Sequence, residues 1–408
     1  MNFVIPGKVK TLSYILMAIG VIALIWGYIQ GGGEGGDHHQ RWWSNMVVDG
    51  FFFLAIGLGA MFFYALQYAA EVGWSSQIKR LFEAMFSYVP VGLVLMMIIV
   101  IAGQFGIHHS WHWMDSSVYE QGTDTYDAII ANKKPYFGWF FWVRQVAYLA
   151  VFIFFARFFR KQSLLEDQVG GTEIHYKLFR RGALFLVFFA VFSSTMAWDW
   201  LMSIDTHWFS TMYGWYVFSG MWVTCMIFAT LLTLWLRHKG HLPHINDSHV
   251  HDLTKWMFAI SMLWSYLWFC QFMLIWYSNI PEEVQYFTTR FFGEHGGSSP
   301  YLVPFMLMFF INFALPFYML IARDAKRNPT FIIGVGIIIF ISHFVDVYLL
   351  VIPGTIHMHD FHGFQWWEWG TFAGFFGLFL MFTMRALSKA PLVPVNHPFL
   401  DESKHHQI

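Results

Sequence analysis

The sequence has little charge and almost no cysteine for its length. Of its 408 residues, 12% are charged and 57% are hydrophobic, whereas a soluble domain carries about 25% charged residues. This composition excludes an ordinary soluble domain, and a net charge of -1 gives no basis for nucleic-acid binding. Cys225 and Cys270 both lie inside apolar runs, so the sequence supplies neither a disulfide framework nor four ligands for an iron–sulfur cluster.

Ligands for other redox centres are also scarce. A haem held between membrane helices needs an axial ligand from each of two helices, and His343 is the only histidine well inside an apolar run. His108, His109 and His112 lie close together without a carboxylate or cysteine that would complete a zinc signature. We therefore expect this chain to bind no metal and no cofactor, so that any electron chemistry must use cofactors held by partners.

Long apolar runs are what the sequence has in abundance. A bilayer core of ~30 Å needs ~20 mostly apolar residues at ~1.5 Å per residue. Ten segments meet this rule, and the first is interpreted as a retained anchor because it has no small-residue cleavage pattern. The predicted fold class is an all-α integral membrane protein, one polytopic domain over residues 1–408. The predicted spans are 11–30, 46–70, 81–105, 137–156, 181–203, 211–236, 256–279, 301–322, 330–352 and 366–386.

Lysine and arginine predict how these spans are oriented, because short cytoplasmic loops retain positive charge. With the N-terminus inside, the inner segments hold 19 of the 24 basic residues and the outer segments hold 4. The remaining one, Arg144, lies inside a span. This asymmetry predicts an inner-membrane protein with both termini in the cytoplasm. The outer loops at 108–115 and 356–369 are rich in Trp and His, which suits either partner docking or an interfacial aromatic belt.

Ionisable side chains inside the spans are the candidate functional groups. Each costs at least ~2.5 to 3.5 kcal/mol near the bilayer centre, so it usually faces a bundle interior, a partner or water. Arg144 lies roughly 10 Å inside the outer end of the fourth span by helical rise, and Asp199 and Asp49 reach a similar level in the fifth and second spans. We predict a buried network of these three residues, acting either as a proton relay or only as a lock between helices.

A similar pattern recurs four spans later. His343 and Asp346 are three residues apart, which places them on one face of the ninth span. Spans two to five and six to nine also run in the same directions. We therefore predict two four-helix bundles, over residues 46–203 and 211–352, flanked by the first and last spans.

Further relay candidates lie near the inner end of the third span. Pro90 removes the helical hydrogen bond to the carbonyl of Phe86, close to Tyr88 and about one turn from Glu83. The freed carbonyl either binds water, which would place Glu83 and Tyr88 in a proton path, or is satisfied by neighbouring groups in a kinked helix.

Two stretches of the sequence resemble a known family. They are STMAWDWLMSIDTHW at 194–208, continued by FSTMYGWYVFSG to Gly220, and FMLIWYSNIPEE at 272–283. Both resemble the NrfD/PsrC-type membrane subunits of alternative complex III, a bacterial quinol:cytochrome c oxidoreductase. The resemblance covers essentially the whole chain and is nearest to the F-type subunit.

The resemblance implies a set of partners and a role. Haem c and iron–sulfur clusters would be held by periplasmic subunits, a multihaem cytochrome and an iron–sulfur protein, and quinol would be the substrate of the complex. A paralogous C-type membrane subunit, membrane lipids and a terminal oxidase would be further partners. This chain would support assembly and conduct or release protons. Its relay groups, matched by depth and chemistry, would be Asp49, Arg144, Asp199, His343 and Asp346.

Three alternatives stay open. In the first, the chain has its own quinol site near the periplasmic face, with Asp199 accepting the hydroxyl proton and Trp198 or Trp200 against the ring. In the second, it is a secondary transporter, which predicts a midplane cavity and helices broken by glycine. In the third, it is a purely structural anchor.

Overall fold

The chain folds almost entirely into helices. A computed structural model describes residues 3–31, 39–293 and 297–407, and it is 79% helical, with no strand in the described part. Ten helical segments there are long and apolar enough to cross a membrane. The predicted fold class, an all-α multi-pass membrane protein, is therefore confirmed. The spanning helices are α1 (Gly7–Gly31), α2 (Gln40–Ala69), α3 with α4 (Lys79–Phe86 and Val89–Gln104), α7 (Trp139–Val169), α8 (Glu173–Trp200), α9 (Met212–His238), α10 (Asp247–Ser278), α12 (Leu302–Leu320), α13 (Pro329–Thr355) and α14 (Trp366–Leu387).

Most predicted span ends differ from the helix ends by only a few residues, but three were placed well inside their helices. Helix α7 runs to Val169 instead of 156, α8 begins at Glu173 instead of 181, and α10 begins at Asp247 instead of 256. These extensions are rich in charged and polar residues. Helices continue past the apolar core because such residues are good helix formers in the aqueous layer, whereas an apolar-run rule ends at the first charges.

The helices contact one another in two rings. Helices α2, α3 with α4, α7 and α8 form one ring, and α9, α10, α12 and α13 form the other, while α1 packs along α14. Helix α2 also contacts α9 and α13 of the second ring. Of the most apolar 18-residue stretch of α2, 89% is buried, against 22% for the corresponding stretches of α1 and α12. Helix α2 is therefore central, whereas α1 and α12 face outward.

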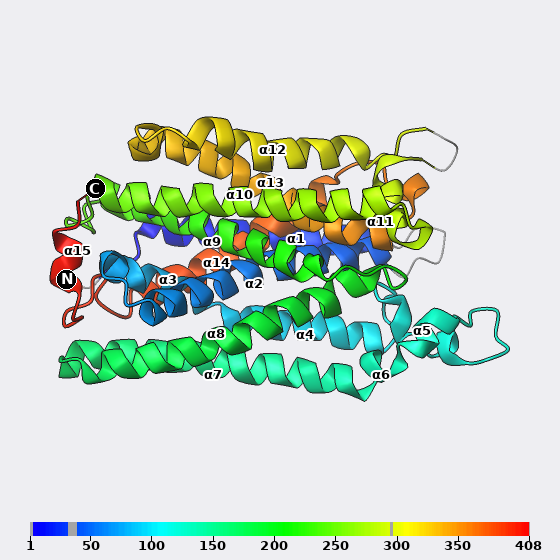
Figure 1. The fold of residues 1–408 in the computed structure, drawn as a ribbon, viewed down its shortest axis with the longest axis horizontal. Helices are drawn as coiled ribbons and strands as arrows, with labels where there is room; N and C mark the ends of the chain where they lie inside the picture. Colours follow the sequence, from blue (N-terminus) through cyan, green and yellow to red (C-terminus); the bar gives the residue numbers. More distant parts are fainter. Residues whose placement is uncertain (1–2, 32–38, 294–296, 408) are drawn as a thin grey trace.

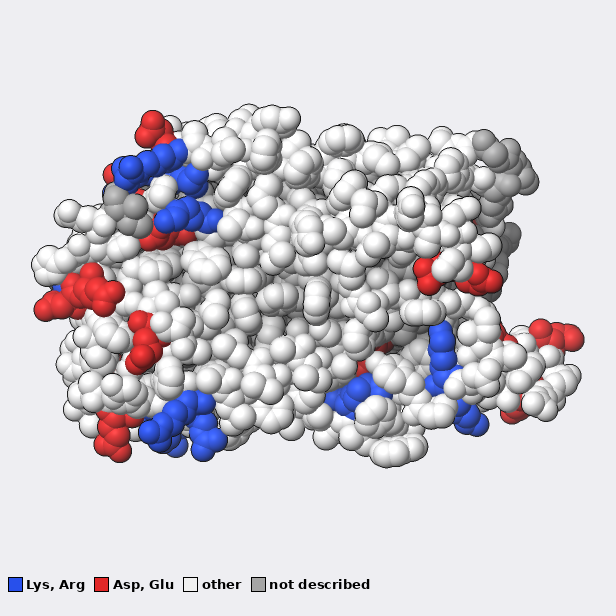
Figure 2. All heavy atoms as spheres, viewed as in Figure 1, with Lys and Arg blue, Asp and Glu red and all other residues white. Residues whose placement is uncertain are grey.

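Both termini lie at the same end of the molecule, which is called the terminal end below; the opposite end carries the short helices α5 (Ala128–Asn132) and α11 (Pro281–Phe291) (Figure 1). Charged side chains gather toward these two ends on the face in Figure 2, with a broad zone of few charges between them. This distribution fits a protein whose middle zone lies in hydrocarbon.

The helix of the third span is interrupted just before Pro90, as expected for a proline. Helix α3 ends at Phe86 and α4 begins at Val89 with Pro90 in its first turn. The amides of Ser87 and Tyr88 bond to carbonyls three residues back, at 3.3 Å each. A tight turn thus satisfies these backbone groups, as expected at a helix end.

Candidate functional site

Arg144 and Asp199 form a closed ion pair between α7 and α8. The Arg144 guanidinium donates to both oxygens of the Asp199 carboxylate, at 2.8 and 2.7 Å. Tyr148 and Gln145 donate to the same carboxylate at 2.8 and 3.3 Å. Asp199 is fully buried, and the Arg144 guanidinium lies 3.8 Å from the ring centroid of Tyr136. This bidentate geometry is the strongest form of an ion pair and locks α7 to α8.

The two tryptophans beside Asp199 differ in their surroundings. Trp200 is fully buried and donates to Gln145 at 2.7 Å. Because Gln145 in turn donates to Asp199, Trp200 supports the ion pair indirectly. Trp198 is half-buried and its Nε1 has no hydrogen-bond partner among the described residues. Since four donors already occupy the Asp199 carboxylate, a quinol hydroxyl would have to displace one of them to bind there.

The prediction that Asp49 joins this network is wrong. Asp49 is fully buried and accepts from Asn45 at 3.2 Å, and the same amide donates to Thr371 of α14 at 2.6 Å. Its carboxylate forms no ion pair with any described residue. Helical rise predicts depth along a span, but the rotation of α2 turns Asp49 toward α14 instead of α7.

A second ion pair involves Glu368, which lies one turn before Thr371 on α14. Arg41 donates to both oxygens of Glu368, at 2.8 and 3.1 Å, and Tyr348 donates to Glu368 at 3.0 Å. Neither Arg41 nor Glu368 was assigned a role from the sequence. Glu368 is only 1% exposed and also caps α14, so this pair ties α2, α13 and α14 together.

His343 and Asp346 lie on one face of α13, as their spacing predicts. The shortest distance from His343 Nδ1 to an Asp346 oxygen is 3.8 Å. Tyr216 of α9 donates a short hydrogen bond to Asp346, and Trp264 of α10 donates to it at 3.1 Å. Asn312 lies 3.5 Å from the same histidine nitrogen. Both residues are buried, and neutral donors surround the carboxylate without an arginine or lysine.

A small cavity lies beside Asp346, between the two rings of helices. Its volume is about 20 Å³, and Phe51 and Phe52 of α2, Gly220 and Thr224 of α9, and His343 and Asp346 line part of it. A site needs roughly 10 to 15 Å³ and two or more polar partners to hold a water. The cavity therefore has room for one water next to the carboxylate.

Glu83 and Tyr88 do not form one site. Glu83 is fully buried near the terminal end, where Arg80 and Arg160 bind it at 2.9 and 2.6 Å and Ser163 also donates. The Tyr88 ring packs against Phe379 at 5.3 Å, and its hydroxyl has no partner among the described residues. The helix break at Ser87 separates them, because it turns the two side chains to different neighbours.

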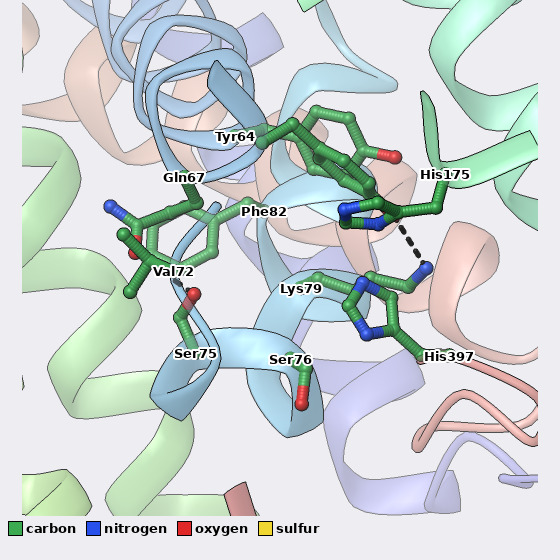
Figure 3. A pocket seen from close by; sticks show the side chains of 10 residues that line it. Tyr64, Gln67, Val72, Ser75, Ser76, Lys79, Phe82, His175 and His397 are labelled. Carbon is green, nitrogen blue, oxygen red and sulfur yellow. Dashed lines mark hydrogen bonds between the residues drawn. The ribbon is translucent and has the colours of Figure 1, made fainter. Parts of the chain in front are cut away.

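A further cluster beside Glu83 was missed by the sequence reasoning. Lys79 of α3 forms a short ion pair with Glu166 of α7 and donates to Tyr68 of α2 at 2.8 Å, and all three are buried. The Lys79 side chain reaches toward His175 of α8 and His397 of the C-terminal segment (Figure 3). Lysines next to spans were counted only as topology signals. The feature of the sequence that could have indicated this cluster is an acidic residue, Glu166, in the polar extension of α7.

Glu166, His175 and His397 form a group with metal-ligand chemistry. One ligand atom from each lies within 4.8 Å of the others, and neither nitrogen of His175 has a hydrogen-bond partner among the described residues. Two histidines and a carboxylate suit zinc. However, the Lys79 ammonium already neutralises Glu166 in this space. A divalent cation bound there would be repelled by the positive charge of Lys79. We assign no metal to the group.

His397 belongs to a C-terminal segment, 388–407, that folds back over the terminal end. Ser76 donates to the carbonyl of Phe399 at 3.2 Å, and Ser403 donates to the carbonyl of Trp74 at 2.6 Å. Burial, helped by the charge of Lys79, lowers the pKa of His397 to about 2. The ring is therefore held neutral against Tyr68 and His175, and the segment closes the mouth of the cluster.

No family model matches the chain, and no curated protein matches it significantly. The likeness to alternative complex III subunits therefore stays a prediction from the motifs of the sequence.

Proposed function

We propose that this chain is the membrane subunit of a bacterial quinol:cytochrome c oxidoreductase of the alternative complex III kind, in the inner membrane with both termini in the cytoplasm. Within that complex it conducts or releases protons that accompany quinol oxidation by its partners. The motifs at 194–220 and 272–283, the ten spans and the uneven distribution of basic residues support this role.

One observation carries the proton role: two carboxylates, Asp346 and Asp49, are buried at membrane depth with only neutral donors around them. Buried acidic groups inside membrane spans that lack a lysine or arginine partner are typical members of proton relays. The cavity beside Asp346 has room for a water that passes the proton onward.

Asp199 is less suited to this task. The bidentate bond from Arg144 and the bond from Tyr148 already occupy both oxygens of its carboxylate. We assign the Arg144–Asp199 pair to holding α7 and α8 together, and we assign proton transfer to Asp346 with His343, and to Asp49.

Two measurements test the proposal. An affinity-tagged chain, purified from its native membrane in mild detergent, should retain partners with the absorption of haem c and should oxidise a short-chain quinol with cytochrome c as acceptor. In proteoliposomes, the assembled complex with Asp346→Asn should move at least threefold fewer protons per electron than the wild type.

Glu120→Gln is the matched control, because Glu120 is exposed in a loop outside the spans; it should leave the proton yield unchanged. A native gel establishes that each variant is assembled. Absence of haem from the purified complex would refute the oxidoreductase assignment. An unchanged proton yield in both Asp346→Asn and Asp49→Asn complexes would refute the relay.

A further inference from the structure

The outward face of α7 carries a long groove that the proposed function does not use. Its volume is about 710 Å³, and residues recurring every three or four positions along one face of α7 line it. They are Val146, Leu149, Ala150, Ile153, Phe154, Arg157, Phe158, Lys161 and Gln162. The groove is thus apolar over most of its length and basic at one end.

The two basic residues at that end have no acidic partner. Arg157 and Lys161 are four residues apart, exposed, and form no ion pair with a described residue. Arg160 on the same turn points inward and pairs with Glu83 at 2.6 Å. A group of Lys and Arg side chains lies over the terminal-end part of α7 and α8 in Figure 2. Lys177 of α8 lies nearby, 5.8 Å from the ring centroid of Phe158.

The length of the groove matches one leaflet of a bilayer. From Val146 to Arg157 is eleven residues, or about 16 Å at ~1.5 Å per residue. The hydrocarbon of a single leaflet is about 15 Å, half of a ~30 Å core. Val146 is at the middle of the predicted span 137–156, so Arg157 and Lys161 are expected at the level of the phosphates of the terminal-end leaflet. The exposed apolar face of α7 continues past the groove to Val143 and Trp139. The two basic residues at the head end, and not the length of the apolar face, therefore favour a lipid over a partner helix.

We propose that this groove is a binding site for one anionic phospholipid. The phosphate lies between Arg157 and Lys161, and the acyl chains lie along Val146, Ala150 and Phe154. Gln162, which is 6% exposed, also lines the head end. This proposal does not depend on the identity of the complex.

The test is lipid titration of the purified full-length protein in detergent, followed by native mass spectrometry. Phosphatidylglycerol should bind the wild type more tightly than phosphatidylcholine. Arg157→Gln with Lys161→Gln should weaken phosphatidylglycerol binding about 30-fold, since each basic group near a membrane surface contributes about 1 kcal/mol. Ala150→Trp fills the exposed middle of the groove and should weaken the binding of both lipids.

Lys8→Gln with Lys10→Gln is the matched control. It removes the same charge at the same end of the molecule from exposed residues of α1, and it should leave phosphatidylglycerol affinity unchanged. Equal affinity of the wild type for the two lipids would mean that Arg157 and Lys161 reach the membrane surface without binding an anionic headgroup, and would overturn the proposal. Loss of a partner subunit from the Arg157/Lys161 variant, with lipid binding intact, would assign the groove to a protein and would also overturn it. Competition by inorganic phosphate without any effect of Ala150→Trp would reduce the site to a free anion site.

Discussion

At the scale of single residues, the buried charges divide into two kinds. Arg144 with Asp199 and Arg41 with Glu368 are bidentate pairs in which each charge is satisfied inside the protein. Asp49 and Asp346 are held only by neutral donors. The first kind fixes the distance between two helices, and the second is the kind to which we assign proton transfer. The same residue type therefore serves different purposes at similar depth.

The Arg144–Asp199 pair is expected to be structural. Asp199→Asn leaves the buried guanidinium of Arg144 without its counterion, and breaking a buried pair costs about 3 to 5 kcal/mol. The variant should unfold at a clearly lower temperature in detergent, whereas Arg144→Met with Asp199→Leu should recover part of the loss. Glu120→Gln serves as the exposed control. A thermal midpoint of Asp199→Asn equal to that of the wild type would show that the pair does not hold α7 to α8.

Tyr216 is expected to be a positioning residue for Asp346. Its hydroxyl donates a short hydrogen bond to that carboxylate. Tyr216→Phe removes this donor and keeps the ring, so the carboxylate loses one of the groups that fix its position. The assembled Tyr216→Phe complex should move fewer protons per electron than the wild type, and adding Tyr216→Phe to Asp346→Asn should cause no further loss, because the two residues act through one contact. A further loss in the double variant would indicate that Tyr216 does not act through Asp346.

The sequence predicts the position of a residue along its helix better than the direction in which its side chain points. The depth of Arg144, Asp199 and Asp346 follows from helical rise, and the shared face of His343 and Asp346 follows from their spacing. The rotation of each helix about its axis does not follow, because an all-round apolar helix such as α2 gives no stripe to orient it. Asp49 was misplaced for this reason. Lys79 was missed because loop lysines were counted as topology signals, although a returning C-terminal segment buries them.

At the scale of helices, the contact of α1 with α14 depends on small residues. A Cβ atom built on Gly374 would lie 2.5 Å from the Cα of Gly20, and one on Gly20 would lie 2.4 Å from the Cα of Gly374. Gly370 and Gly374 are four residues apart, the spacing at which small residues let membrane helices approach closely. Helix α1 is otherwise largely exposed, so this seam is its main attachment.

Gly374→Leu should therefore detach α1. The side chain would meet backbone atoms, which cannot move aside without separating the helices. Backbone amides of α1 should exchange hydrogen faster in Gly374→Leu than in the wild type, because a helix that has lost its packing opens more often. Gly334→Leu is the control, because a Cβ on Gly334 meets nothing within 4 Å. Equal exchange of the α1 amides in Gly374→Leu and the wild type would contradict the close seam.

The C-terminal segment should dock in a pH-dependent way. The pKa of His397 is about 2 in the docked segment and ordinarily 6.5, so the released segment binds a proton first as pH falls. Docking should be full above about pH 6.5 and weaken progressively below it. Hydrogen exchange over 395–403, corrected for its intrinsic rate, should rise between pH 7.5 and 5.

His397→Gln isolates this group and should flatten the change in exchange. His406 pairs with Asp252 at 2.7 Å, and its protonation acts in the opposite direction because the charged ring binds the carboxylate more strongly. Exchange that stays constant with pH in the wild type, or that rises equally in His397→Gln, would exclude His397 as the source.

At the scale of the whole molecule, α2 belongs to one ring of helices and contacts the other, and the two carboxylates without a cation lie at different contacts of it. Asp49 faces Asn45 and Thr371, and Asp346 faces Tyr216 and Trp264. The apolar rings of Phe51 and Phe52 line the cavity on the Asp346 side. No described hydrogen bond joins the two carboxylates. The arrangement therefore favours two separate proton routes over one continuous chain.

Separate routes make a quantitative prediction for the double variant. If each carboxylate serves its own route, Asp49→Asn and Asp346→Asn should each remove a fraction of the proton yield per electron, and the double variant should lose the sum of the two fractions. Effects of sites without shared partners add, whereas residues in one network couple. Proteoliposome measurements on the assembled complexes distinguish these cases. A double variant no worse than the more damaging single one would place both carboxylates on one path, and a polar connection through α2 would then have to open during turnover.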